Sequence, residues 1–525
     1  MKKKKKRQNQ SRIVDTVIAL VFSAGVGYAG VSGLQMIGNK EKSFFDHFVE
    51  YDNKFDWLMA QELSYQVPLL VLVVAVFTLM ATMTKKKESG YKDASNHGAY
   101  GNAVFSDFED VRESGFIAER KQSKWSKKDP LKTLEVREGI ILGMEEDELF
   151  IIHPESNLDN RNVLVVGSSG SSKGQAFVIN NIINNKSQSI VVTDPKGELY
   201  GLTADIKRDQ GYQVEQIDFL NLKGSRYNPL DYVDNDIEAI KISNAISINS
   251  AKDVKQDFFF NTARDLLTGL IIYAKAEYDS PNISRTVKGI FNRITSDEEY
   301  LPQLCERIGE EHTAYQYLKD ASAQTGNTRA SILSSFAQQT GVFSLGDVAK
   351  LTEKSDFSFH DLQEQKTILY VKIPVKDNPV PALTATFFDQ LISTLYQIGD
   401  ENGAVLKIPT IFLLDEFANL GKLNDFDNTL STCRGYDMSI LTIVQDFAQL
   451  EGKYSKELSR SIINNHDTTL FLRTKDVETA KYFERLAGDT TVNFSTKSSS
   501  NSGGFLYILG FGSSNPSKST SEQYI

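Results

Sequence analysis

Two long apolar stretches stand near the start of the chain. Residues 13–38 contain a single charged side chain, Asp15, and residues 65–84 contain none. About 20 apolar residues are enough for a helix to cross the hydrocarbon layer of a membrane, so the pattern predicts two transmembrane helices. A cleaved signal peptide is the alternative for the first stretch. It fits less well, because the apolar run is too long and a second span follows.

The charges beside these stretches predict their orientation. Residues 1–12 are rich in Lys and Arg and residues 85–87 are all lysine, whereas residues 39–64 mix acids and bases. Positively charged flanks stay in the cytoplasm. We therefore expect residues 1–12 to be a basic cytoplasmic tail and residues 13–87 a two-helix anchor in the cytoplasmic (inner) membrane, with a short external loop and both chain termini inside. The alternative for the first lysine run is a solvated arm that binds nucleic acid.

The letters GVGYAG at residues 25–30 match the GxGxxG pattern of dinucleotide-binding loops. They follow no predicted strand and lie within the first apolar stretch, so the context that such a loop requires is missing. We interpret these glycines as points where two helices pack closely.

Beyond residue 160 the pattern changes to short apolar runs separated by helical segments. The runs typical of β-strands lie at residues 163–166, 189–194, 211–219, 366–373, 410–416, 438–445 and 468–473. Strands that alternate with helices favour a parallel, doubly wound sheet. The stretch between the third and fourth runs shows helical periodicity alone. The predicted fold class is therefore α/β, a parallel sheet with an inserted all-helical domain.

The domain boundaries follow these changes in pattern. Residues 88–232 and 346–494 should form the sheet domain, and residues 233–345 the all-helical domain. Residues 495–525 are rich in Ser, Gly, Asn and Lys, which is typical of a flexible tail. The pattern assigns no role to the apolar island at residues 505–511.

Composition narrows the function. The formal net charge is −10, which argues against a basic protein that coats DNA, although a motor that grips DNA within a pore can be acidic overall. The two cysteines, Cys305 and Cys433, are far apart and lack the spacing of metal ligands. They argue against a disulfide scaffold or a zinc site and fit a reducing compartment.

A small-residue loop follows the first predicted strand. The segment VLVVGSSGSSKGQ, residues 163–175, leads from a strand through this loop into a helix that Lys173 opens. Small residues let backbone N–H groups turn toward phosphates, and the Lys reaches the β- and γ-phosphates. The pattern GxxxxGK[ST] is broken by Ser172 and by Gly174, so a flexible turn before a helix is the alternative. The residues expected around the phosphates are Gly167, Ser168, Ser169, Gly170, Ser171, Ser172, Lys173, Gly174 and Gln175.

Two acids end the strand TIFLLDE, residues 410–416. We expect Asp415 to hold Mg²⁺ directly or through water, and Glu416 to polarise the attacking water. Gln445 ends the next strand, where it could sense the γ-phosphate, and Arg434 precedes that strand, where it could reach a neighbouring subunit's nucleotide. The alternatives are a strand end that meets solvent and a surface arginine paired with an acid. Together with the loop, these residues predict a RecA-like P-loop ATPase that uses ATP and Mg²⁺.

The motifs resemble those of the type IV coupling proteins, the ATPases of bacterial conjugation and type IV secretion. The resemblance covers nearly the whole chain. Besides the two apolar stretches it is carried by GSSGSSKG, VVTDPKGELY (191–200), RYNPL (226–230), LLDEFANLGKL (413–423) and IVQDFAQLEGKY (443–454). It places Lys173, Asp415, Glu416, Gln445 and Arg434 at the phosphate, metal, water, sensor and trans-arginine positions, with Asp194 and Lys196 beside the phosphate loop.

The resemblance also implies partners. It implies a homo-hexameric cytoplasmic ring that receives single-stranded DNA bound to its relaxase and feeds both to a type IV secretion channel. Two alternatives stay open at this point. One is a septal-type translocase of double-stranded DNA. The other is a substrate receptor that hydrolyses ATP weakly, which Ser172 and the short carboxyl-terminal end would suit.

Overall fold

The computed structural model divides the chain into two compact units. One contains residues 1–104 and 489–525, and the other contains residues 105–488. The structure describes residues 27–37, 43, 46, 54–83, 91–93, 102–106, 110–111, 139–145, 148–154, 156, 158–250, 255–276, 286–374, 378–500 and 517–524.

The first unit begins with helices that pack on one another. Residues 27–37 are helical and are followed by α3 (Lys54–Met59) and α4 (Leu63–Met83). A Cβ placed on Gly30 would lie only 2.3 Å from Cδ1 of Leu69 in α4. This glycine is therefore a close-packing point, as expected of the GVGYAG segment.

The second predicted span corresponds to most of α4, while much of the first lies outside the described residues, which begin at residue 27. Within the part of the chain that the structure describes, no helix combines the length and apolar character needed to cross a membrane.

The first unit also contains a three-stranded sheet. Strand β12 (Val492–Ser500) pairs antiparallel with both β1 (Tyr91–Asp93) and β13 (Ser517–Tyr524). The prediction of a flexible tail over residues 495–525 is therefore wrong for the paired strands. The polar composition misled it, because backbone groups make the ladder whatever the side chains are. The apolar island at residues 505–511 lies outside the described residues.

The core of the second unit is an eight-stranded sheet. From one edge to the other it contains β11 (Thr468–Arg473), β4 (Val163–Gly167), β10 (Met438–Val444), β9 (Thr410–Leu414), β5 (Ser189–Thr193), β8 (Thr367–Lys372), β6 (Gln213–Asp218) and β7 (Lys223–Gly224). All neighbours are parallel except β6 and β7. The prediction of a parallel sheet is confirmed. A separate hairpin joins β2 (Ile140–Glu145) to β3 (Glu148–Ile152).

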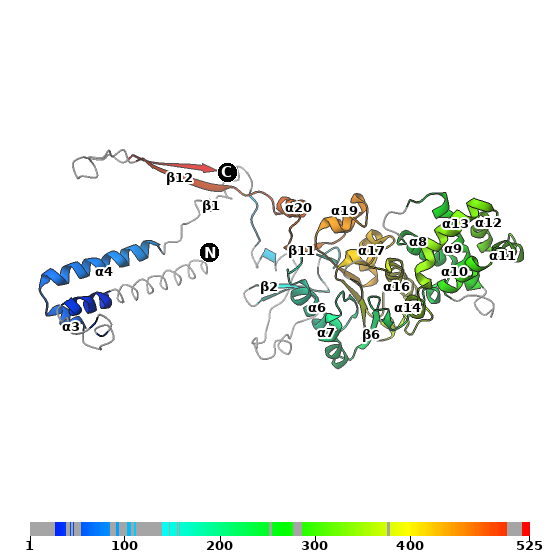
Figure 1. Ribbon diagram of the computed structural model, residues 1–525, viewed down its shortest axis with the longest axis horizontal. Coiled ribbons are helices and arrows are strands. Elements are labelled where there is room, and N and C mark those ends of the chain that lie inside the picture. Colours follow the sequence, from blue (N-terminus) through cyan, green and yellow to red (C-terminus); the bar gives the residue numbers. More distant parts are fainter. Residues whose placement is uncertain are drawn as a thin grey trace. The chain divides into compact units, whose positions relative to one another are not determined.

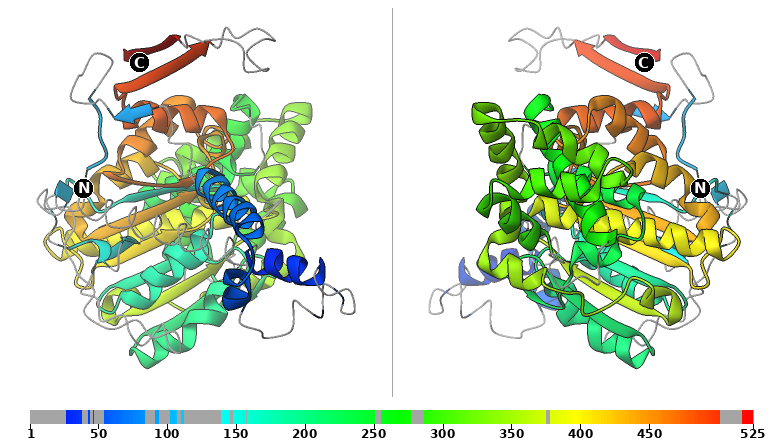
Figure 2. Two further views of the ribbon diagram at one scale, coloured as in Figure 1. Left: turned by 90° about the vertical axis from the view of Figure 1, so that its left-hand side faces the viewer. Right: turned by 90° about the vertical axis from the view of Figure 1, so that its right-hand side faces the viewer.

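Helices cover both faces of this sheet (Figure 2), because its strands are apolar on both sides. In β4, Val163 and Val165 belong to one buried cluster, whereas Leu164 and Val166 belong to the other. The first cluster packs against η2 (Gly174–Val178), α6 (Ile179–Asn184) and α7 (Glu198–Asp209), and the second against α16 (Pro381–Glu401), α17 (Phe426–Thr432), α19 (Lys456–Asn464) and α20 (Val477–Ala487). Successive side chains of a strand point to opposite faces, so each strand serves both layers.

The stretch between β7 and β8 is helical, as its periodicity predicts. It contains α8 (Asp236–Ile248), α9 (Phe258–Ala276), α10 (Val287–Ser296), α11 (Tyr300–Ile308), α12 (Thr313–Ser322), α13 (Gly326–Thr340) and α14 (Gly346–Leu351). In Figure 1, α9 to α13 gather together to one side of the sheet strands. Polar caps fix where helices start: the Asn235 side chain accepts a hydrogen bond from the Glu238 amide, and Thr286 does the same for Gly289.

Candidate nucleotide-binding site

The small-residue loop leaves the carboxyl end of β4 and turns back on itself. The Ser171 amide donates to the Ser168 carbonyl over 3.1 Å, and the Ser168 amide donates to the Arg473 carbonyl over 2.8 Å. A Cβ on Gly167 would lie 2.5 Å from Oγ of Ser171 and 3.0 Å from the Lys173 side chain. A side chain at position 167 would therefore force the Ser171 hydroxyl and the Lys173 side chain to move, which glycine avoids.

The two departures from the usual loop pattern have different local consequences. Ser172 has a φ of 61°, in the left-handed region that costs a residue with a Cβ about 1–2 kcal/mol. A Cβ at Gly174 would meet nothing within 4 Å. A serine would therefore fit at position 174, and packing does not explain why the hydroxyl is missing there.

Two serine hydroxyls in the loop suit a bound phosphate chain. The Oγ atoms of Ser168 and Ser171 are buried, and neither has a hydrogen-bond partner among the described residues. Buried polar atoms are almost always hydrogen-bonded in folded proteins, so two orphaned hydroxyls in one loop call for a ligand. The loop leads into the helical turn that Lys173 opens, and helix N-termini attract anions. The residues present therefore fit a nucleotide's phosphates.

The acids predicted to act on the metal and on water follow β9. Asp415 accepts a hydrogen bond from the Glu416 amide over 3.0 Å, and Glu416 has a left-handed φ of 51°. Burial, together with the nearby Glu416 charge, raises the pKa of Asp415 to about 6. A divalent cation would offset the free-energy cost of burying Asp415 in its ionised form, because it stabilises the carboxylate.

The ends of three strands bring Lys173, Glu416 and Gln445 together. Nζ of Lys173 lies 3.8 Å from Oε1 of Glu416 and also donates to the Gly167 carbonyl. Nε2 of Gln445, just beyond β10, donates to both carboxylate oxygens of Glu416, over 3.2 and 3.0 Å. Residues separated by more than 270 positions thus form one contiguous cluster.

The DPKGEL segment lies beside the acids rather than directly beside the phosphate loop. Strands β10 and β9 stand between β4 and β5, which leads into this segment. Asp194 is buried and accepts from the Tyr200 amide over 2.9 Å, while Oγ1 of Thr193 donates to the Asp415 carbonyl over 2.7 Å. Lys196 is exposed. The segment therefore supports the end of β9.

Arg434 lies away from this cluster. It belongs to the turn η6 (Cys433–Tyr436), immediately before the amino end of β10, whereas Gln445 follows the carboxyl end of that strand. The six steps from the first to the last residue of β10, at about 3.3 Å each, separate the two ends by about 20 Å. Asp437, three residues after Arg434, contacts Arg161 instead, with Nη2 and Oδ1 3.9 Å apart. Nη1 of Arg434 donates to the Asp159 carbonyl.

Sequence reasoning missed Arg473. It ends β11 in register with Gly167, and its carbonyl holds the Ser168 amide. Its side chain is exposed at the same edge of the sheet as the phosphate loop. The sequence shows a positively charged residue at the end of the predicted strand 468–473. It gives no sign that this strand lies beside β4, because that depends on the order of the strands in the sheet.

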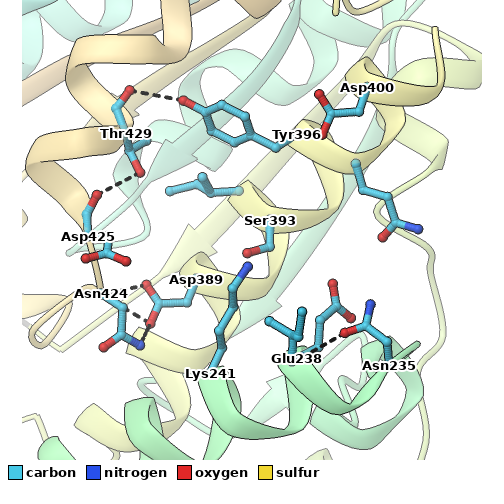
Figure 3. Close-up of a pocket in the computed structure, with 13 residues that line it drawn as sticks. Asn235, Glu238, Lys241, Asp389, Ser393, Tyr396, Asp400, Asn424, Asp425 and Thr429 are labelled. Atoms are coloured by element: carbon cyan, nitrogen blue, oxygen red, sulfur yellow. Dashed lines mark hydrogen bonds between the residues drawn. The ribbon is translucent and has the colours of Figure 1, made fainter.

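A cavity of about 500 Å³ lies between α8, α16 and the chain around the start of α17. Asp389 accepts hydrogen bonds from the Asn424 amide over 3.1 Å and from its side chain over 2.7 Å, and burial raises the pKa of Asp389 well above its usual range. Figure 3 shows Lys241 reaching into the cavity near Asp389 and Ser393. None of the predicted site residues lines it, so it is separate from the phosphate loop.

Comparison with known proteins places the chain in a family. The family model described as "Type IV secretory system Conjugative DNA transfer" matches residues 105–523. Protein VirD4 of Rhizobium radiobacter is 27% identical over 435 residues, covering 80% of this chain and 59% of that protein. Conjugal transfer protein TraG of Escherichia coli is 24% identical over 447 residues, covering 80% of this chain and 69% of that protein. The chain thus spans about three fifths of the length of the VirD4 relative.

Solved structures agree at the level of the fold. The plasmid coupling protein TrwB in complex with the ATP analogue ADPNP is 15% identical, with a TM-score of 0.52, covering 72% of this chain and 85% of that one. TrwB in complex with ADP and Mg²⁺ is also 15% identical, with a TM-score of 0.51, covering 68% and 80%. These values show a TrwB-like, RecA-type α/β fold. By the match over residues 105–523, the chain belongs to the family of type IV secretory system conjugative DNA transfer proteins.

Proposed function

We propose that this protein is a membrane-anchored ATPase that moves relaxase-bound single-stranded DNA into a type IV secretion channel. One observation carries the proposal. Lys173, Glu416 and Gln445 converge beside a loop with two buried serine hydroxyls that have no hydrogen-bond partner among the described residues. The names of the VirD4 and TraG relatives support the role in conjugation, and the TrwB complexes support ATP and Mg²⁺ as ligands.

Each of these residues has a proposed task in hydrolysis. Lys173 and the loop hydroxyls would bind the phosphates, and Asp415 would hold Mg²⁺, which would supply positive charge to the phosphates when bound. Lys173 contacts the Gly167 carbonyl and Glu416, so it must turn toward the phosphates as they bind. Glu416 is then free to orient water, and the two hydrogen bonds from Gln445 keep its carboxylate aimed. Because Gln445 touches Glu416, it can report the state of the nucleotide to β10.

Arg434 is proposed to act on the nucleotide of a neighbouring subunit in a homo-hexamer. Its place about 20 Å from its own site along β10 supports this assignment. An arginine supplied in trans stabilises charge on the transferred phosphoryl group and can raise the rate about 10³-fold or more. Hydrolysis should therefore rise faster than linearly with protein concentration.

A mixing experiment tests the trans arrangement. Arg434→Ala and Lys173→Ala subunits, each inactive alone, should regain hydrolysis when mixed, because one of the mixed interfaces holds both intact residues. Co-purification through two different tags would verify that mixed oligomers form. If they form and no activity returns, Arg434 does not act in trans.

The membrane anchor is proposed from the amino-terminal sequence. Two apolar stretches with lysine-rich outer flanks support two spans with both termini in the cytoplasm. Reporter fusions at position 50 and after position 90 test the topology. The first should report from outside and the second from the cytoplasm, and an external signal from the second would refute the orientation.

The choice of substrate has its own experiment. Hydrolysis should be stimulated by single-stranded DNA, and more weakly by a duplex of equal length. A preference for duplex would point to a translocase of double-stranded DNA instead. The left-handed backbone of Ser172 favours one rival, a receptor that hydrolyses ATP weakly. A rate that stays at background with every DNA, in oligomers shown to bind nucleotide, would support that rival.

A further inference from the structure

The short segment before β4 holds the turn that carries Arg434. Asn162 is fully buried and uses both ends of its amide. Its Nδ2 donates to the Leu430 carbonyl over 2.8 Å, and its Oδ1 accepts from the Ile440 amide over 3.0 Å. The Cys433 thiol also donates to this oxygen, with Sγ 3.3 Å away. One side chain thus ties together the residues before, within and after the arginine turn.

Adjacent residues of the segment hold the same turn. The Asp159 carbonyl accepts a hydrogen bond from the Arg434 guanidinium itself. Arg161 is mostly buried and pairs with Asp437, the residue that follows the turn. Contacts from three residues of one segment therefore hold both the backbone of the turn and one guanidinium nitrogen of Arg434.

The segment is also the beginning of the strand that ends in the phosphate loop. Asn162 directly precedes β4, and β4 ends at Gly167. Strand β4 pairs with β10 from Val163 opposite Leu441 to Val166 opposite Val444. A five-residue strand of about 17 Å therefore separates a subunit's own phosphate loop from Asn162, which holds the turn that carries Arg434.

We propose that Asn162 is a positioning residue for Arg434, and that β4 links the phosphate loop of each subunit to the arginine it offers its neighbour. The inference rests on the proposed trans role of Arg434. The link is short because the arginine turn is fastened to the amino end of the strand whose carboxyl end meets the phosphates. A shift of β4 on nucleotide binding would move both ends together.

A purely structural role for Asn162 makes a different prediction. Removing its amide leaves the Leu430 carbonyl and the Ile440 amide without their partner, which costs stability in any case. Loss of stability alone would impair both halves of the subunit, the site and the arginine. A positioning role impairs the arginine only. Mixing variants distinguishes the two roles. In a mixed oligomer one subunit supplies the nucleotide site and its neighbour supplies the arginine, so a defect in either part shows separately.

The test uses full-length Asn162→Ala subunits mixed with each parent variant. With Lys173→Ala, hydrolysis should return to the level of the Arg434→Ala plus Lys173→Ala mixture. In an equal, random mixture roughly a quarter of the interfaces would be intact, since each of two adjacent places must hold the right subunit. With Arg434→Ala, no activity should return, because every arginine is missing or misplaced.

Asp437→Ala and Asn181→Ala complete the experiment. Asp437 is partly exposed, so its loss should leave the fold intact while it removes the Arg161 pair. It should lower the rate about two- to fivefold, as expected for a weak pair, and the rate per subunit with an intact Lys173 should rise when Lys173→Ala subunits are mixed in. Asn181 is also buried and bonds the Ile141 amide and carbonyl, but it lies in α6 behind the phosphate loop. It is the matched control, and Lys173→Ala should not restore it.

The outcomes separate the two proposals. Failure of the parent pair, Arg434→Ala with Lys173→Ala, overturns the trans arginine. If the parent pair works, rescue of Asn162→Ala by Arg434→Ala, or no rescue by Lys173→Ala, overturns the positioning role. If Asn162→Ala does not fold, Asp437→Ala takes its place in the mixtures with Lys173→Ala and with Arg434→Ala.

Discussion

Replacing Asp415 by Asn should stabilise the nucleotide-free protein while it abolishes the use of Mg²⁺. The Asp415 carboxyl group loses its proton less readily than a solvent-exposed aspartic acid does. Burial beside Glu416 raises its pKa from 3.8 to about 6. About 2 pKa units at 1.36 kcal/mol each give a cost of up to about 3 kcal/mol for the ionised form. An asparagine has no charge to bury, and its carbonyl oxygen can keep the hydrogen bond from the Glu416 amide.

The pH dependence gives the sign of this effect. A carboxyl group whose pKa is raised on folding binds its proton more tightly in the folded state. Its contribution to stability is intact below about pH 4 and is lost as the pH rises through about 6. The advantage of Asp415→Asn over the wild type should therefore be small near pH 4, about half developed near pH 5 and complete by pH 8.

Thermal unfolding in EDTA at these three pH values is the assay. The melting temperature of the variant should exceed that of the wild type by a few degrees at pH 8, since about 3 kcal/mol is spread over a large domain. Added Mg²⁺ and ADPNP should then stabilise the wild type and not the variant. An equal shift at all three pH values, or no shift at pH 8, would refute the burial argument.

Three further substitutions probe the same site. Glu416→Gln should bind Mg²⁺-nucleotide normally but hydrolyse it at least 100-fold more slowly, because an amide does not activate water; a normal steady-state rate would remove Glu416 from the mechanism. Ser172→Gly should tighten ATP binding up to about fivefold, since about 1 kcal/mol of left-handed strain is relieved, and weaker binding by calorimetry would show that the serine is adapted to the loop. Gly174→Ser should fold normally, because the position is open, and should strengthen Mg²⁺ binding a few-fold; a loss of stability would contradict the open geometry.

The parts of the fold that sequence reveals are those with a local signature. The runs that became β4, β9 and β10 are buried on both faces, and such strands read as continuous apolar stretches. Polar residues directly after such runs, as with Asp415 and Gln445, meet at one edge when the strands are parallel. The residue types that make up the site can therefore be predicted from the sequence before the fold is known.

What sequence does not reveal is the order of the strands. The insertion of β10 between β4 and β9 places Gln445 against Glu416, and moves Asp194 away from the phosphate loop. Pairing joins backbone groups that are hundreds of residues apart, so no local pattern reports it. The same reason hides Arg473 beside the loop and Asn162 beneath the arginine turn. In the polar hairpin of β12 and β13, side-chain composition gave no sign of the backbone ladder.

The proposed function requires that ATP hydrolysis at Glu416 drives a DNA strand through this protein. Formaldehyde crosslinking in donor cells, followed by purification of the tagged protein, measures whether the strand is there. The wild type should recover the transferred strand and its relaxase, and Glu416→Gln should recover both in at least equal amount while recipients receive none. Absence of the strand from wild-type and Glu416→Gln samples alike, or normal transfer by Glu416→Gln, would contradict the account.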